Sequence, residues 1–222
     1  MRNAPVRGHD GGPQDRIRVA VLGVLALLAS AAGWAEQGET TGDVRLPALR
    51  AELLSMFDAD QAAQQSVIHA GDDKQAAAEQ LRELNARHLQ RLKAIIGEHG
   101  WPGTDLVGED GAHAAWLLVQ HMDADPAFQE RCLELLKVAV KGGRASGKDL
   151  AYLTDRVRVA QGQPQTYGTQ FRQDGEFTVL APVEDPEGLD RRRAELGLPT
   201  MDEYYRMMRE TYPGIRLKEG MQ

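Results

Sequence analysis

The sequence has a single cysteine, Cys132, among its 222 residues. No disulfide can therefore form within the chain, even in an oxidising compartment. An extended basic cluster is also missing, and acidic residues outnumber lysine and arginine by 33 to 26. Phosphate backbones and anionic lipid surfaces attract basic patches, so we expect no nucleic-acid partner.

Several signatures of hydrolytic enzymes are missing as well. The sequence has neither the two-histidine motif of helix-borne zinc proteases nor a nucleophile elbow. Cys132 belongs to an apolar helical stripe, and Ser146 fits the N-cap of a helix. Neither residue is therefore a candidate nucleophile.

The N-terminal part has the layout of a secretory signal peptide. Arg16 and Arg18 precede the apolar run 19–28, and small residues follow up to Ala35. We expect residues 1–35 to be a signal peptide cleaved after Ala35, with the protein periplasmic or extracellular. An uncleaved membrane anchor and a buried helix remain alternatives. Cleavage removes four arginines and two aspartates, which leaves 22 basic and 31 acidic residues and a formal charge of −9.

The remainder of the chain is predicted to be a linker and one domain. Residues 36–44 are polar and contain glycine and threonine, which is typical of a linker. Residues 45–222 suit a single domain large enough to bury a hydrophobic core. Apolar residues at helical spacing predict a series of helices up to about residue 160.

The predicted boundaries come from local signals. The third helix is expected over 109–122, and Asp125 is the expected N-cap of the next. A strand over 166–171, paired with 176–180 through a tight turn, is predicted to form a β-hairpin. A short charged helix and a helix opened by a capping box at Thr200 follow. The predicted fold is thus mainly α, with one β-hairpin before the last two helices.

The third helix carries an unusual group of polar residues. At 100° per residue His113, Gln120 and His121 fall in one narrow sector of a largely apolar helix. The sector is either an exposed strip, the floor of a polar pocket, or a place for satisfied core histidines. As a candidate catalytic group we take His121, because imidazole exchanges protons near neutral pH.

Further candidates lie downstream of this helix. We expect Asp123 or Asp155 to orient His121 as the other members of a catalytic group. A polar ligand is expected to contact the following residues: Gln120, Tyr152, Arg156, Tyr167 and Gln170. For Arg156 the alternative is a surface ion pair with little effect on stability, and for the strand an ordinary edge hairpin. The arginine run 191–193 is either a solvated face or the source of one inward-pointing guanidinium.

A metal site is a weaker alternative. His121, Asp123 and Asp125 are possible ligands, but residues two apart do not share a helical face. We therefore predict neither a metal nor a cofactor.

Six motifs in order resemble a known family. They are Asp60-Gln61, Gly100-Trp101-Pro102, WLLVQHMD at 116–123, LAYLTDRV at 150–157, YGTQ at 167–170 and DRR at 190–192. The set resembles a bacterial domain-of-unknown-function family of small, mostly helical proteins, many with export signals. The resemblance covers roughly residues 46–208. It implies one domain and polar motifs that belong to one site, and it implies no reaction.

Two functional hypotheses remain open. In the first, the protein is an exported enzyme of hydrolase or lyase type, in which His121 is the general acid or base. In the second, the same polar groups form a non-catalytic ligand-binding or protein-interaction site. In both, the partner is a small molecule or an envelope component, and membrane contact arises only through an uncleaved signal segment. The position of His121 relative to the carboxylates discriminates between the hypotheses.

Overall fold

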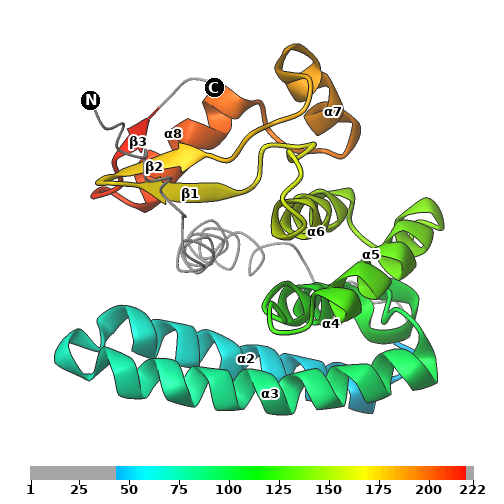
Figure 1. Ribbon diagram of the computed structural model, residues 1–222. Helices are drawn as coiled ribbons and strands as arrows, with labels where there is room; N and C mark the ends of the chain where they lie inside the picture. Colours follow the sequence, from blue (N-terminus) through cyan, green and yellow to red (C-terminus); the bar gives the residue numbers. More distant parts are fainter. Residues whose placement is uncertain (1–43, 219–222) are drawn as a thin grey trace, which may run out of the picture.

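The computed structural model describes residues 44–218 of the chain. Within that range seven α-helices accompany one three-stranded sheet, which confirms the predicted mainly α fold with a hairpin before the last two helices. The expected signal peptide, 1–35, and all but the last residue of the expected linker lie outside the described residues. Figure 1 shows the helices α2 and α3 along the bottom, α4 to α6 in the middle, and the sheet with α7 and α8 at the top.

Two long antiparallel helices form the base of the molecule. Helix α2 (Pro47–His69) is followed by the 3₁₀ turn η2 (Gly71–Asp73) and by α3 (Lys74–His99). Arg91 of α3 donates to both carboxylate oxygens of Glu52 on α2, at 2.5 and 2.8 Å. Each helix turns one side inward, so that leucine and isoleucine residues of both enter the main core.

Helix α4 (Thr104–Gln120) packs along α2 and forms the centre of that core. The helices run in the same direction, because Arg50 pairs with Asp110 and contacts continue to the C-terminal end of α4. The predicted start at residue 109 is wrong by five residues. A break at Gly108, with φ of 74°, divides α4 and accounts for the late start of its apolar pattern.

The next two helices begin where local capping signals predict. In α5 (Pro126–Lys141) the Asp125 carboxylate accepts a hydrogen bond from the Phe128 amide, as expected of an N-cap. The Ser146 hydroxyl likewise caps α6 (Gly147–Ala160) by accepting from the Lys148 amide. Helices α5 and α6 pack on each other, and α6 also contacts α4.

The first strand of the β-hairpin lies closer to the turn than the predicted range 166–171. Strand β1 (Phe171–Asp174) pairs antiparallel with β2 (Phe177–Leu180), and Phe171 lies opposite Leu180. Residues 166–170, predicted to be strand, form an irregular loop instead. The sheet also has a third strand, β3 (Leu217–Lys218), which pairs in parallel with β2.

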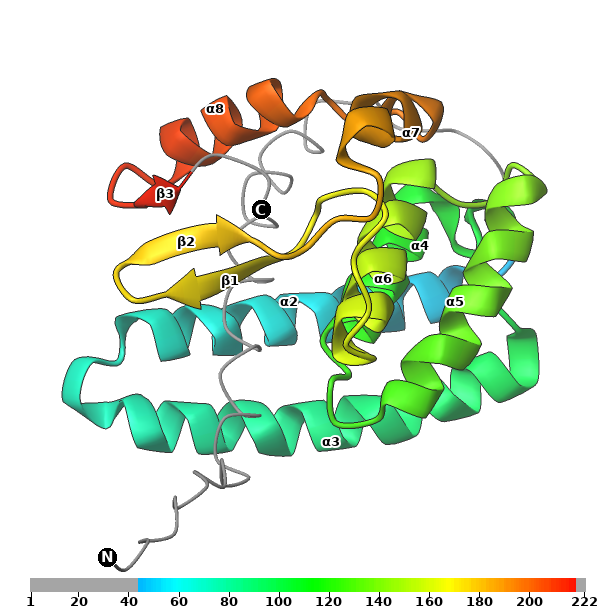
Figure 2. The same ribbon diagram turned by 45° about the horizontal axis from the view of Figure 1, so that its top comes forward.

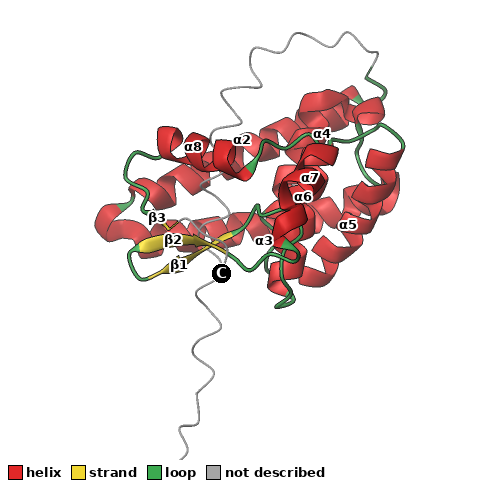
Figure 3. Cartoon of the chain, turned by 90° about the horizontal axis from the view of Figure 1, so that it is seen from above, coloured by secondary structure: helices red, strands yellow, loops and turns green. Residues whose placement is uncertain are grey.

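Two short helices cover the hairpin and build a second, smaller core with it. The 3₁₀ turn η3 (Pro186–Gly188) leads into α7 (Leu189–Glu195), and α8 (Met201–Thr211) opens with the predicted capping box. In Figure 2 the hairpin lies between α8 and the α2–α3 layer, and in Figure 3 the hairpin and α8 lie on one side of α6 while α5 lies on the other. The buried members of this core are Phe171, Leu189, Met201, Tyr204, Tyr205 and Met208. None of the helices in the described range combines the length and apolarity that a membrane span requires.

Candidate functional site

A buried histidine and a buried carboxylate meet between α2 and α4. His121 follows the last residue of α4, and its Nδ1 lies 2.8 and 2.9 Å from the two carboxylate oxygens of Asp60 on α2. Their side chains are 3% and 0% exposed. We assign the proton on Nδ1 as the donor in this contact, because a carboxylate only accepts. In the neutral imidazole the opposite ring nitrogen, Nε2, carries a lone pair.

This Nε2 atom is itself buried, and it has no hydrogen-bond partner among residues 44–218. Two glutamine side chains contact the other side of the pair, namely Nδ1 of His121 and the Asp60 carboxylate. The Gln64 amide nitrogen lies 3.4 Å from Nδ1, and the Gln61 amide donates to Asp60 at 3.0 Å. Asp60 is therefore held on its helix while it holds the imidazole.

A second buried histidine comes from α3. Burial lowers the pKa of His88, an effect that the nearby negative charge of Asp60 opposes. Its Nδ1 has no hydrogen-bond partner in the described part of the chain, and the same is true of the buried side-chain oxygen of Asn85, one turn away on α3. Three helices thus contribute polar groups around the Asp60 carboxylate.

The Gln120 side chain adjoins His121 but lies on a different side of α4. It is 1% exposed, and neither its amide oxygen nor its amide nitrogen has a partner among residues 44–218. Around α4, Gln120 lies about 100° from His121 and about 40° from Trp116. It therefore faces away from α2, towards the side where Trp116 contacts Tyr152 of α6. Since Gln120 and His121 are both buried, the exposed-strip interpretation of this sector is wrong.

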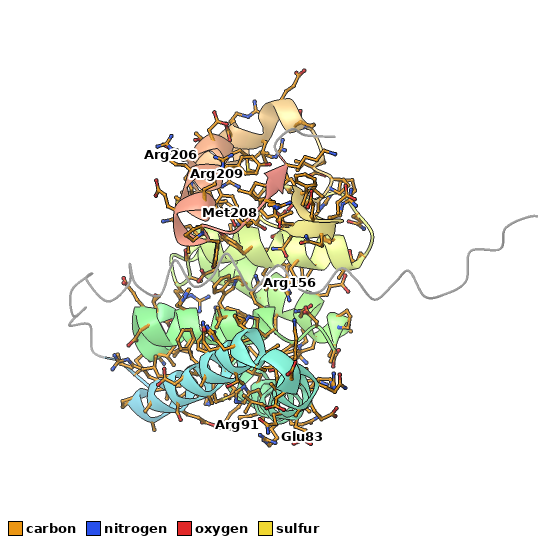
Figure 4. All side chains as sticks on the ribbon, turned by 90° about the vertical axis from the view of Figure 1, so that its left-hand side faces the viewer. Glu83, Arg91, Arg156, Arg206, Met208 and Arg209 are labelled. Atoms are coloured by element: carbon orange, nitrogen blue, oxygen red, sulfur yellow. The ribbon has the colours of Figure 1, made fainter. Side chains whose placement is uncertain are left out.

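The end of α4 that carries these residues is fixed by a network of side chains. Gln129 of α5 donates to the carbonyl oxygens of Val119 and Gln120 at 3.1 and 3.0 Å, and it also contacts Asp123 at 3.3 Å. Arg156 of α6 donates two hydrogen bonds to the Asp123 carboxylate, at 2.8 and 2.5 Å. In Figure 4 Arg156 lies at mid-height, between the α2–α3 layer and α8. The network ties α4, α5 and α6 together beside His121.

Asp155 has a different environment. Its fully buried carboxylate accepts hydrogen bonds from the backbone amides of Thr166, Tyr167 and Thr169, and from the Thr169 hydroxyl at 2.9 Å. Burial raises the pKa of Asp155, and these donors oppose the rise. Because their amides bind this carboxylate, residues 166–170 cannot use them in a strand ladder. This explains the irregular loop.

The carboxylate expected at His121 was therefore misassigned. The prediction that Asp123 or Asp155 orients the ring is wrong, because Asp60 is the carboxylate that contacts it. Asp123 pairs with Arg156, and Asp155 anchors the 166–170 loop. The sequence did not single out His88 as a functional residue, because His88 lies on the apolar face of α3 together with Leu92 and Ile95.

The other predicted ligand contacts fall into two groups. Gln120 lies beside His121, whereas Tyr167 and Gln170 belong to the loop that Asp155 anchors. Tyr152 lies on α6, between Trp116 of α4 and Tyr204 of α8. The Tyr152 hydroxyl contacts the Tyr204 hydroxyl at 3.2 Å, and the Gln170 side chain donates to Thr169. Within residues 44–218 none of these three side chains forms a hydrogen bond with His121.

Two other candidates have clear structural partners. An inward-pointing guanidinium is present in the arginine run, since Arg193 is 1% exposed, and it donates to the carbonyl oxygens of Tyr167 and Pro199. Asp125, considered as a metal ligand, caps α5 and pairs with Lys93. Across residues 44–218 no three histidine, cysteine or acidic side chains converge in an arrangement suited to a metal ion.

Comparison with protein families identifies the family of this chain. The profile of a family described as "Family of unknown function (DUF6624)" matches residues 47–218. The chain belongs to DUF6624. The match extends from α2 to β3, so Asp60, His88 and His121 all lie inside the DUF6624 region. The resemblance to a domain-of-unknown-function family is thereby confirmed. Neither curated proteins nor solved structures give a match to this DUF6624 chain.

Proposed function

We propose that this DUF6624 domain is an enzyme in which His121 is the general acid or base and Asp60 positions it. The supporting observation is the buried pair itself, with the Asp60 carboxylate on Nδ1 and a buried Nε2 that has no hydrogen-bond partner among residues 44–218. A carboxylate in this position fixes the tautomer of the ring and stabilises the imidazolium that forms when Nε2 takes a proton.

The chemistry is of hydrolase or lyase type. In a hydrolysis, Nε2 of His121 takes a proton from water while the water oxygen attacks the substrate, and the imidazolium returns that proton to the leaving group. A cysteine nucleophile does not fit, because burial raises the pKa of the Cys132 thiol to about 12. The attacking group is therefore a water molecule or a group of the substrate.

A second function is favoured by one observation. Gln120 presents both a donor and an acceptor that have no partner among residues 44–218, which suits recognition of a polar ligand without turnover. The same residues would then form a binding site, and His121 would contribute hydrogen bonds only. The two functions differ in whether replacement of His121 abolishes a reaction or only weakens a complex.

The cellular setting is part of the proposal. The arginine-led apolar segment near the N-terminus supports export, and hence a small molecule or an envelope component as the partner. Appearance of the full chain in the periplasmic or culture fraction, with its retention in the cytoplasm after deletion of residues 16–35, is the expected result. Equal distribution of both forms would contradict export.

The enzymatic proposal is tested by a substrate screen on the full chain. Chromogenic esters, amides, glycosides and phosphoesters are incubated with the wild type, with His121→Gln and with His69→Gln, whose histidine is exposed at the end of α2. Turnover by the wild type and His69→Gln, and a loss of about 100-fold or more in folded His121→Gln, is expected. Equal turnover by all three proteins would contradict the role of His121. Binding that needs Gln120 without turnover would favour the second function.

A further inference from the structure

The buried polar atoms at the Asp60–His121 site that lack a partner among residues 44–218 indicate which class of ligand the site binds. We infer that the Asp60–His121 site takes an uncharged small molecule rich in hydroxyl or amide groups, rather than a phosphate ester or a carboxylate. The inference rests on the proposed function of this site and specifies its substrate class.

The first argument is the number of buried polar atoms that lack a partner. Native proteins leave few such atoms, because water is lost on burial and nothing replaces it. Within residues 44–218 five of them belong to this region: Nε2 of His121, both amide atoms of Gln120, Nδ1 of His88 and Oδ1 of Asn85. Their number indicates that a ligand with several hydrogen-bonding groups completes the site.

The second argument is where these atoms are held. The His121 ring bonds directly to Asp60, and His88 lies close enough for the charge of Asp60 to affect its pKa. Gln120 adjoins His121, and its backbone carbonyl is fixed by Gln129. The groups therefore come from α3 and from the C-terminal end of α4. His121 and His88 lie near the Asp60 carboxylate of α2, and Gln120 lies next to His121 on the side of α4 that faces α6.

The third argument is the balance of donors and acceptors. With its Nδ1 proton directed to Asp60, His121 offers an acceptor at Nε2, and the side-chain oxygens of Gln120 and Asn85 are also acceptors. The Gln120 amide nitrogen is a donor. A phosphate or carboxylate only accepts hydrogen bonds, so it would leave these acceptors unsatisfied. Hydroxyl and amide groups donate and accept, and thus match both kinds of atom.

The fourth argument is charge. The Asp60 carboxylate places a negative charge beside His121, and an anionic ligand would be repelled by it in a poorly solvated environment. The cations at the adjoining α4–α5 turn are already paired, Arg156 with Asp123 and Lys93 with Asp125. An anion bound here would lack a compensating charge from either of them.

The experiment uses matched probes and the full-length wild type. Ring nitrogens of ¹⁵N-histidine-labelled protein are followed by NMR during titration with N-acetylglucosamine or N-acetylglucosamine 6-phosphate, and with glucose or glucuronate. We expect at least one uncharged member to shift the His121 and His88 signals saturably, and to bind at least tenfold more tightly than its anionic analogue. Tighter binding of the anionic members, or no saturable shift from any probe, would overturn the inference.

Variants identify the groups involved. Gln120→Leu is expected to weaken binding of the uncharged probe at least tenfold, whereas Gln161→Leu, at an exposed glutamine, leaves it unchanged. Equal affinity of Gln120→Leu and the wild type would remove Gln120 from the site and overturn the inference. The outcome is separable from the proposed reaction. Selective binding of an uncharged probe, together with turnover that does not depend on His121, would sustain the ligand class and contradict catalysis by His121.

Discussion

The imidazole of His121 and the carboxylate of Asp60 form a fully buried pair across 61 positions of sequence, with Nδ1 2.8 Å from Oδ2. The parallel packing of α2 and α4 brings them together, and the Arg50–Asp110 pair holds the opposite end of the same helix contact. Removing one partner of this buried hydrogen bond leaves the other polar group buried without it. The candidate site is therefore complete only when α2 is packed against α4.

Replacing this carboxylate tests its positioning role. In Asp60→Asn the side chain can still hydrogen-bond the ring, but it no longer fixes one tautomer or stabilises the imidazolium. We expect kcat to fall by about 10² to 10⁴-fold with a smaller change in KM. Steady-state kinetics on a substrate from the screen measure the split. Asp58→Asn, at an exposed position of α2, is the control, and a wild-type kcat in Asp60→Asn would contradict the role.

Asp155 is expected to matter for stability. Asp155→Ala removes the acceptor of three backbone amides and one hydroxyl in the loop after α6. The free energy of unfolding should fall by about 3 to 5 kcal/mol, since buried donors are left without partners. Urea unfolding measures the loss, and hydrogen exchange should accelerate at Thr166, Tyr167 and Thr169. A change below about 1 kcal/mol would show that the loop does not depend on this carboxylate.

Gln129 is predicted to support the end of α4. Gln129→Leu keeps a similar volume but leaves the carbonyl oxygens of Val119 and Gln120 without this donor. We expect a loss of about 1 to 3 kcal/mol in unfolding free energy and a displaced His121 ring signal in NMR spectra. Gln161→Leu removes only an exposed contact with Glu130 and should change stability by less than about 0.5 kcal/mol. Equal losses in the two variants would refute the prediction.

The lowered pKa of His88 predicts that the free energy of unfolding depends on pH. Burial lowers the pKa of His88, so the unfolded chain takes up its proton at a higher pH than the folded protein. Its contribution to stability is complete above the unfolded pKa of about 6.5 and is lost as the pH falls below that value. Urea unfolding between pH 5 and pH 8 should show a shallower loss on the acid side in His88→Gln than in the wild type. The exposed His69→Gln serves as control, and identical pH slopes in all three proteins would contradict the effect.

Cys132 is predicted to be unreactive in the folded protein. With a pKa of about 12, only about one thiol in ten thousand is ionised at pH 8, against roughly a quarter for an ordinary cysteine. Iodoacetamide at pH 8 should therefore leave the native protein unmodified and label it rapidly in urea, as mass spectrometry would show. Rapid labelling of the native protein would mean that Cys132 is accessible and ionised.

Local signals in the sequence predicted local structure well. Asp125 and Thr200 cap helices as expected, because a cap depends on residues within one turn. Helical periodicity likewise placed Gln120 and His121 together on α4. These predictions needed no knowledge of how the helices pack.

Tertiary contacts explain the errors. The partner of His121 is 61 positions away, so nearby Asp123 and the polar face of α6 were stronger candidates in the sequence than Asp60. Residues 166–170 alternate like a strand, yet Asp155 binds the amides that a strand would use. The first deciding hydrogen bond spans 61 positions, and the second comes from α6, 11 to 14 positions before the loop.

The wide sequence separation of Asp60 and His121 also bears on how the protein folds. Their contact closes a segment that contains the whole of α3, and closing long segments costs chain entropy before any contact compensates for it. The α2–α3 hairpin and the caps of α5 and α8 involve much shorter separations. The helices can thus form early, while the candidate site is completed only when α2 settles against α4, so a refolding chain would regain its helical content before its ligand affinity.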